Sequence, residues 1–199
     1  MTGLNIDASR TALLSMDMQT AIISIYTKDN PNFLPRVARV LDVTRKNRIR
    51  LLHVQVGFRP GLPEVDPRNQ LFGAVKSSPK WQQIFQGPAG AIHPDVAPHG
   101  DEIVITKHRV SAFAGTDLDM ILRANQVDTL ILVGIATSGV VLSTLLHASD
   151  ADYRLVVVKD CCTDLDSEVH ACLTEKFLPQ RATVLTADEL LQSLQSASV

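Results

Sequence analysis

Six short apolar segments recur along the chain, and most of them are nearly continuous instead of alternating with polar residues. They span residues 11–16, 49–56, 103–106, 129–133, 154–158 and 182–185. Continuous apolar runs of this length are typical of strands that are covered on both faces, as in a parallel sheet. We therefore predict a mainly parallel sheet with helices on either side.

Helical patterns separate several of these runs. Apolar residues recur at helical spacing over 33–46, 117–125, 140–151, 167–177 and 187–194, with Thr116 as a candidate N-cap of the second pattern. Alternating strands and helices predict an α/β fold, a three-layer doubly wound sandwich. At 199 residues the chain is expected to form a single domain, 1–199.

Residues 57–100 interrupt this alternation and hold seven of the ten prolines. The stretch FRPGLPEVDP is composed of turn-forming residues. A connection of this length inside a compact domain is usually functional. We expect it to cover an edge of the sheet or to contact a second subunit, with Trp81 and Phe85 as candidate anchors. The alternative is a surface excursion without a role in chemistry.

Composition limits the classes of molecule that the protein is expected to bind. A net charge of −2 gives no reason to expect nucleic acid or an anionic membrane. No apolar run reaches the ~18 residues that span a bilayer, and polar residues 1–10 do not resemble a signal peptide. We expect a cytoplasmic protein with a small-molecule substrate and no cofactor. The three cysteines suggest neither disulfides nor zinc, and no dinucleotide-binding glycine motif is present.

Candidate functional residues follow the predicted strands, where ligands bind in open parallel sheets. Asp17 follows the first strand, Gln55 and Arg59 lie at the end of the second, and Lys107 follows the third. The turn at 134–140 follows the fourth. An acid, an amine and a backbone-rich turn suit acid–base chemistry beside a site for an oxyanion or water. Taken singly, Asp17 could only cap a helix and Lys107 could be a solvated loop charge.

Several motifs together resemble the isochorismatase-like hydrolase superfamily, also called cysteine hydrolases. The matching stretches are ALLSMDMQ, KHRVSAFAGTDLDMILRANQVDTLILVGIATSGVV and RLVVVKDCCTD. The resemblance implies a six-stranded mainly parallel sheet, catalytic roles for Asp17 and Lys107, and a cis peptide at Ile135–Ala136. It also implies a homo-oligomer, a dimer or a tetramer.

The amidase branch of this superfamily has the turn G-x-A-T-x-x-C-V, which would place its nucleophilic cysteine at position 140. This chain has Val140 there, and the metal-binding Asp-x-His of nicotinamidases is absent after the second strand. The resemblance therefore favours the branch that hydrolyses the vinyl ether isochorismate without a cysteine. In that branch Asp17 would be the general acid, and Lys107 would hold a substrate carboxylate or orient water.

The resemblance also suggests further contacts. The backbone N–H groups of Ala136 and Val140 would bind water or a substrate oxygen. Independently of the resemblance, Gln55 and Arg59 are expected to contact the substrate because of their position at the end of the second strand. Substrate contacts are also expected from Gln19, Phe113 and Ile135. Two alternatives stay open: a catalytically degraded member that binds a small molecule or a protein, and a cysteine-type amidase.

Overall fold

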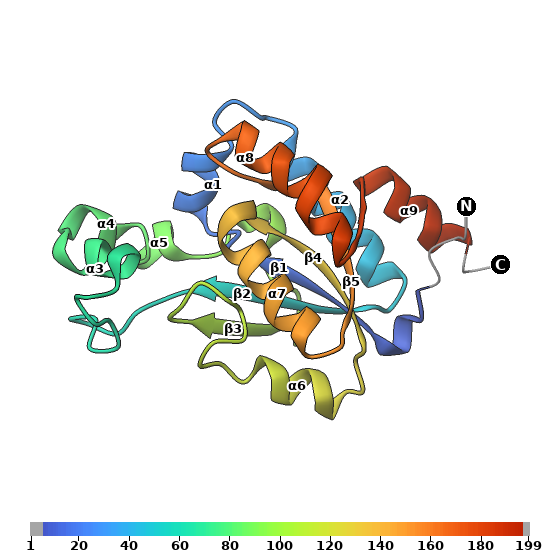
Figure 1. The fold of residues 1–199 in the computed structure, drawn as a ribbon, viewed down its shortest axis with the longest axis horizontal. Helices are drawn as coiled ribbons and strands as arrows, with labels where there is room; N and C mark the ends of the chain where they lie inside the picture. Colours follow the sequence, from blue (N-terminus) through green and yellow to red (C-terminus); the bar gives the residue numbers. More distant parts are fainter. Residues whose placement is uncertain (1–5, 197–199) are drawn as a thin grey trace.

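Six parallel strands form the central sheet of the computed structural model, which describes residues 6–196 (Figure 1). The strands are β1 (Thr11–Met16), β2 (Arg50–Val56), β3 (Ile103–Lys107), β4 (Thr129–Ile135), β5 (Arg154–Thr163) and β6 (Thr183–Leu185). Their order is β3-β2-β1-β4-β5-β6, and every neighbouring pair is parallel. The predicted doubly wound α/β fold is confirmed. The chain changes direction across the sheet between β1 and β4, the place where such folds bind ligands.

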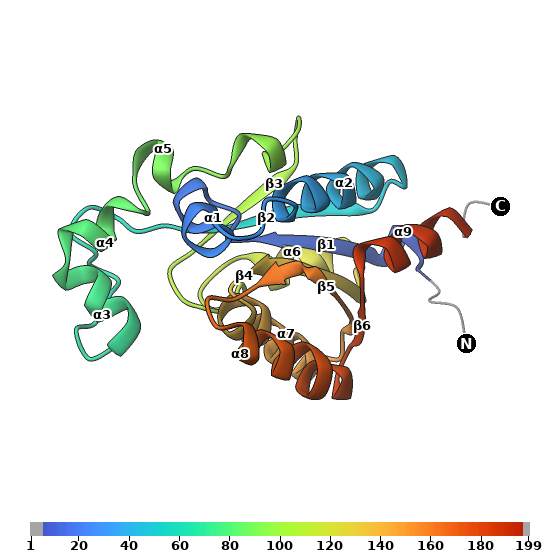
Figure 2. The same ribbon diagram turned by 90° about the horizontal axis from the view of Figure 1, so that it is seen from above.

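Helices cover both faces of the sheet (Figure 2). On one face lie α1 (Thr20–Tyr26), α2 (Phe33–Lys46) and α9 (Ala187–Ser196), and on the other lie α6 (Leu118–Ala124), α7 (Leu142–Asp150) and α8 (Ser167–Cys172). Strand side chains alternate between the two layers, since Leu13 packs in one core cluster and Leu14 in the other. This double burial explains why the strands are continuously apolar.

The degree of burial distinguishes the central strands from the edge strand β3. Every residue of β1 and β4 is buried, whereas Ile103 and Val104 of β3 are exposed by 38% and 40%. An edge strand has a neighbour on one side only, so its apolar run in the sequence does not imply full burial.

The structure contains helices that the sequence patterns missed. Helix α1 was not predicted, and the excursion 57–100 contains α3 (Gln70–Ser77), α4 (Pro79–Gln83) and α5 (Gly87–Gly90). Local caps start two of these helices: Asn69 accepts a hydrogen bond from the N–H of Phe72, and Ser78 precedes a proline in the first turn. The stretch 58–67 contains no helix or strand, as its turn-forming residues predicted.

A polar cluster anchors the start of β3 against α2 and β2. Glu102 accepts hydrogen bonds from Nε and Nη2 of Arg45 at 2.7 and 2.9 Å, and from the N–H of His99 at 2.9 Å. His53 Nε2 lies 3.0 Å from the same carboxylate. The cluster fixes the edge strand at the end opposite to Lys107.

The structure leaves some predictions about the chain ends untested. Residues 1–5 of the polar N-terminal segment, and both ends of the predicted domain 1–199, lie outside the described residues. Among residues 6–196, no helix combines the length and the apolar character that a membrane crossing requires.

Candidate active site

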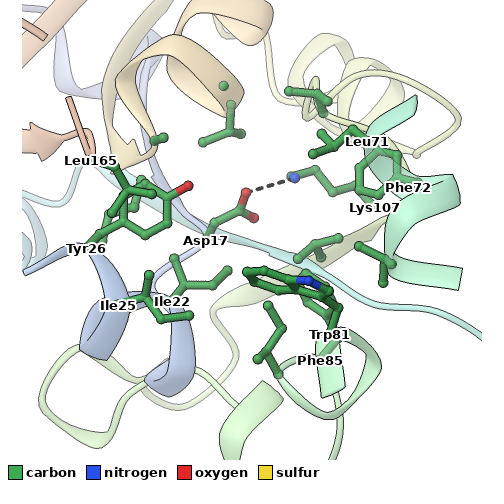
Figure 3. A pocket seen from close by; sticks show the side chains of 18 residues that line it. Asp17, Ile22, Ile25, Tyr26, Leu71, Phe72, Trp81, Phe85, Lys107 and Leu165 are labelled. Carbon is green, nitrogen blue, oxygen red and sulfur yellow. Dashed lines mark ion pairs between the residues drawn. The ribbon is translucent and has the colours of Figure 1, made fainter. Parts of the chain in front are cut away.

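Three strands bring Asp17, Lys107 and the bend after β4 to one place. Asp17 follows β1, Lys107 is the last residue of β3, and Ile135 ends β4. Lys107 Nζ lies 2.9 Å from Asp17 Oδ2 (Figure 3). The sequence-based expectation that an acid and an amine converge beside the bend therefore agrees with the geometry of the described residues.

Asp17 is buried with only part of its carboxyl group bonded. Its side chain is 9% exposed, and Oδ1 accepts no hydrogen bond within the described structure. Its backbone adopts a left-handed conformation at φ 56°, and its N–H donates to the carbonyl of Val54. Burial raises the pKa of Asp17 above its usual value, and the ammonium of Lys107 opposes this shift without cancelling it. A carboxyl group in this setting is suited to holding and delivering a proton.

Lys107 is withdrawn from solvent, with 3% of its side chain exposed. Besides the ion pair with Asp17, its ammonium donates to the carbonyl of Arg109 at 3.2 Å. The alternative that Lys107 is a solvated loop charge is therefore wrong. The ammonium places a positive charge at the base of the site, where an anion or a polarised oxygen could be bound.

The bend after β4 has an unusual backbone. The Ile135–Ala136 peptide bond is cis, as the resemblance implied. The following segment Thr137–Val141 is kinked ahead of α7, because Gly139 has a non-helical backbone with φ −94° and ψ −106°. The helix expected over 140–151 therefore starts regularly only at Leu142. Just before the bend, a Cβ on Gly134 would lie 2.9 Å from both Cβ and the carbonyl oxygen of Met16. Only glycine lets β4 approach β1 this closely.

Two side chains from the α8 region hold the bend. Asp164 Oδ2 accepts a hydrogen bond from the N–H of Ser138 at 2.7 Å. His170 Nδ1 lies 2.8 Å from Thr137 Oγ1. Asp160, which lies in the stretch RLVVVKDCCTD that carries the resemblance, bonds elsewhere: it accepts a hydrogen bond from the N–H of Ala187 at 2.7 Å and pairs with Arg36 at 3.2 Å. It connects β5 to α9 and α2.

A cavity of about 220 Å³ opens in front of the Asp17–Lys107 pair. Its walls come from α1, from the excursion 57–100 and from the bend. The remaining lining residues are Ile22, Ile25, Tyr26, Val56, Leu71, Phe72, Val75, Trp81, Ile84, Phe85, Val110, Ile135, Ala136, Gly139, Val140 and Leu165. In Figure 3, Tyr26 and Lys107 lie on opposite sides of Asp17. The volume is below the ~300–1,000 Å³ typical of drug-sized pockets, so the site suits a small molecule.

The structure brings only some of the predicted contact residues to this pocket. Ile135, Ala136 and Val140 line it, whereas Gln19, Gln55, Arg59 and Phe113 do not. The Gln19 side chain bonds to the carbonyls of Val56 and Gly90 and accepts from the N–H of Val56.

The other three side chains also have partners outside the pocket. Gln55 donates to Thr106 at 3.2 Å, Arg59 lies 3.8 Å from Glu64, and the Phe113 ring stacks on His147 at 4.5 Å. Contact of these four residues with a substrate stays a prediction.

Sequence reasoning missed most of the pocket wall. Tyr26 belongs to the unpredicted helix α1, and Phe72 belongs to α3 within the excursion. Trp81 and Phe85, which we proposed as anchors of a subunit interface, both line the pocket. The sequence signal was the presence of three of the six phenylalanines and the single tryptophan in an otherwise turn-rich segment. The expectation of a subunit interface there stays a prediction.

The cysteines lie away from the pocket lining. Cys161 and Cys162 are buried on β5, as expected for packing residues, and Cys172 is exposed on α8. Burial raises the pKa of Cys162 to about 12 and raises that of Cys161 as well. Among residues 6–196, no group of three or more His, Cys, Asp or Glu side chains could hold a metal ion.

Comparisons with known proteins agree with this geometry. The isochorismatase domain family matches residues 11–189. YwoC of Bacillus subtilis (strain 168), described as an uncharacterized isochorismatase family protein, is 27% identical over 198 residues, which cover 98% of this chain and 100% of YwoC.

The isochorismatase of the same organism is 28% identical over 197 residues, which cover 96% of this chain and 60% of that enzyme. The solved structure of a cysteine hydrolase from Pseudomonas syringae pv. phaseolicola 1448A superposes with a TM-score of 0.85 at 22% identity. That alignment covers 96% of this chain and 95% of the other, and it shows a shared fold.

Proposed function

The chain belongs to the isochorismatase family of hydrolases, and we propose that its reaction centre consists of Asp17, Lys107 and the bend at residues 135–140. The observation that carries this proposal is the buried Asp17–Lys107 pair, which faces a cavity and leaves one carboxyl oxygen without a partner. Perturbed titratable groups in a pocket are typical of catalytic centres. Val140 lines the pocket without filling it, which favours an enzyme over a degraded binding protein.

We further propose that hydrolysis proceeds without a cysteine nucleophile. Val140 has no group that could attack an electrophile, and none of the three cysteines lines the pocket. The raised pKa values of Cys161 and Cys162 keep these thiols protonated, which removes their nucleophilic character. These observations weigh against the alternative of a cysteine-type amidase.

In the proposed reaction Asp17 acts as a general acid on a small carboxylated vinyl ether, isochorismate or another member of that class. The proton of Asp17 moves to the terminal enol carbon, and an oxocarbenium-like species forms. Water then bonds to the electron-poor carbon, and the alcohol leaves as pyruvate is released. Water returns a proton to Asp17, so the balance is one water consumed for each ether bond broken.

Lys107 and the bend support this chemistry. We propose that the ammonium of Lys107 binds the substrate carboxylate, which draws it away from Asp17 and leaves that carboxyl group in its protonated form. The backbone N–H groups of Ala136 and Val140 are proposed to orient the attacking water or a substrate oxygen. Both residues line the cavity beside the acid.

The test is release of pyruvate from isochorismate and from a panel of simpler carboxylated vinyl ethers, measured by coupled oxidation of NADH. The same assay is repeated after treatment with iodoacetamide. We expect turnover that alkylation leaves unchanged. No turnover on the whole panel would refute the general-acid hydrolase, and loss of turnover on alkylation would restore the cysteine-dependent alternative.

A further inference from the structure

The walls of the pocket differ sharply in character from its base. Among the residues that the structure describes, 18 line the pocket; fifteen of them have apolar or aromatic side chains, and Asp17 and Lys107 are the only charged ones. An apolar wall contributes affinity in proportion to the apolar surface that a ligand buries against it. The composition of this wall therefore indicates what the body of the ligand is made of.

The aromatic part of the wall is held in place from behind. Phe72 and Phe85 line the pocket, and each packs edge-to-face on Phe58, with ring centroids 5.5 and 5.4 Å apart. Trp81 and Leu71 continue this wall and are exposed by 49% and 58%. A preformed aromatic surface loses little conformational freedom when a ligand binds.

The described pocket lining offers one positively charged side chain to an anionic group of a ligand. Lys107 is the only cationic residue in the lining, and it is buried. The nearby Arg109 is directed elsewhere, because its guanidinium donates to the carbonyls of His108 and Glu64. A second carboxylate on the ligand would lie against apolar side chains and lose its hydration without a compensating partner.

We propose that the substrate is a small monocarboxylate with an apolar body, whose carboxylate binds Lys107 while its body packs on Phe72, Phe85 and Trp81. This inference rests on the proposed function of the same centre and narrows its substrate class. A dicarboxylate such as isochorismate should be a poorer ligand than a monocarboxylate ether with an alkyl or aryl group.

Trp81 provides a direct test of binding, because it is the only tryptophan of the chain and lines the pocket. Its fluorescence is titrated with 3-phenylpropanoate, propanoate, 3-phenylpropanamide and benzylmalonate. We expect 3-phenylpropanoate to bind about 10–100-fold more tightly than propanoate, since the phenyl ring is buried. It should also bind more tightly than the neutral amide and the dicarboxylate. Equal binding of the acid and the amide, or tighter binding of benzylmalonate, would overturn the proposal.

Matched variants locate the binding to this pocket. Leu71→Ser shortens an exposed apolar side chain of the lining and should weaken 3-phenylpropanoate about threefold. Met120→Ser changes an exposed apolar residue on α6 that does not line the pocket and should have no effect. Lys107→Met should abolish the preference for the acid over the amide. Equal effects of the Leu71 and Met120 substitutions would count against the assigned wall.

Turnover separates this inference from the function on which it rests. Hydrolysis of 2-(benzyloxy)acrylate consumes one water and gives pyruvate and benzyl alcohol, and it should proceed with a lower KM than hydrolysis of 2-methoxyacrylate. If the ligands bind in the expected order but neither ether is hydrolysed, the proposed hydrolase function is refuted and the proposed ligand class still stands. Turnover that is faster with isochorismate than with 2-(benzyloxy)acrylate would refute the ligand class and leave the hydrolase intact.

Discussion

Asp17 and Glu102 are two carboxylates withdrawn from solvent near opposite ends of β3, and their surroundings shift their pKa values in opposite directions. Asp17 faces the cavity, its side chain pairs with Lys107, and its Oδ1 accepts no hydrogen bond from residues 6–196. Burial raises its pKa. Burial also acts to raise the pKa of Glu102, but hydrogen bonds from Arg45, the His99 N–H and His53 outweigh it and lower the value to about 2.

The two carboxylates differ in the number of hydrogen bonds that they accept within the described structure, and we infer that this difference separates a group suited to proton transfer from one that fixes its neighbours. A carboxylate whose oxygens accept several hydrogen bonds stays ionised and fixes its neighbours. One with a free oxygen can exchange a proton with a ligand. If the two roles are distinct, substitutions of Asp17 should change activity and substitutions of Glu102 should change stability.

The largest effect is expected from Asp17→Asn. The amide fills the same space and cannot deliver the proton, so kcat should fall by about 10²–10⁴-fold, the usual contribution of general acid catalysis. The measurement is pyruvate release under saturating substrate, with circular dichroism to confirm folding. Asp29→Asn, at an aspartate whose side chain is 89% exposed, is the matched control and should leave kcat unchanged. Activity retained in Asp17→Asn would remove Asp17 from the reaction.

The pH dependence of activity should follow from the raised pKa of Asp17. Because the proposed mechanism requires the acid form of Asp17, kcat/KM should be constant below the pKa of the free protein and fall about tenfold for each pH unit above it. The profile is measured from pH 4 to 9 with buffers of constant ionic strength. A rate that rises with pH across this range would indicate that the carboxylate, acting as a base, is the working form.

Stability offers a check on the same group without a substrate. The pKa of Asp17 is raised in the folded state, so the folded protein holds the proton more tightly than the unfolded chain. Its contribution to stability is therefore complete below about pH 3.8 and is lost as the pH rises through the folded-state pKa. The free energy of unfolding of the unmodified protein should decrease with pH relative to that of Asp17→Asn.

Glu102→Gln should change stability and leave activity intact. The amide accepts fewer hydrogen bonds and presents a donor to Arg45, so the free energy of unfolding should fall by about 1–3 kcal/mol. Since the pKa of Glu102 is lowered to about 2, this deficit should be complete above pH 4.5 and disappear as the pH falls toward 2. Urea unfolding at several pH values measures this deficit in the free energy of unfolding. Glu175→Gln, at an exposed site, is the control. A large fall in kcat would contradict the separation of the two carboxylates.

Much of the framework could be predicted from the sequence, because continuous apolar strands and helical spacing are local signals. Asp17 and Lys107 could be located because each follows a strand whose direction the parallel fold fixes. The cis bond at Ile135–Ala136 was implied by resemblance alone. These features depend on position along a strand or on a contiguous motif.

The pocket wall could not be predicted in the same way. Tyr26 of α1 and Phe72 of α3 come from segments far apart in the sequence, and no local spacing encodes their approach to one cavity. Gln19 illustrates the converse: it is adjacent to the site in sequence, but its amide is committed to backbone groups of Val56 and Gly90. Which partner a polar side chain selects depends on contacts between distant segments.

The smallest effect is expected from Arg45→Lys, which keeps the charge beside Glu102 and removes the paired geometry of the guanidinium. Arg45 bonds both oxygens of Glu102 and also the carbonyl of Ala97 at 3.2 Å, and an ammonium cannot reproduce this fork. We expect a loss of about 0.5–1.5 kcal/mol in the free energy of unfolding. In the double variant that combines Arg45→Lys with Glu102→Gln, the free energy of unfolding should fall by less than the sum of the two single losses. The reason is that both substitutions disrupt the same interaction. Strictly additive losses would mean that the two side chains stabilise the start of β3 independently. The hydrogen bonds between Arg45 and Glu102 would then not be the interaction that stabilises this segment.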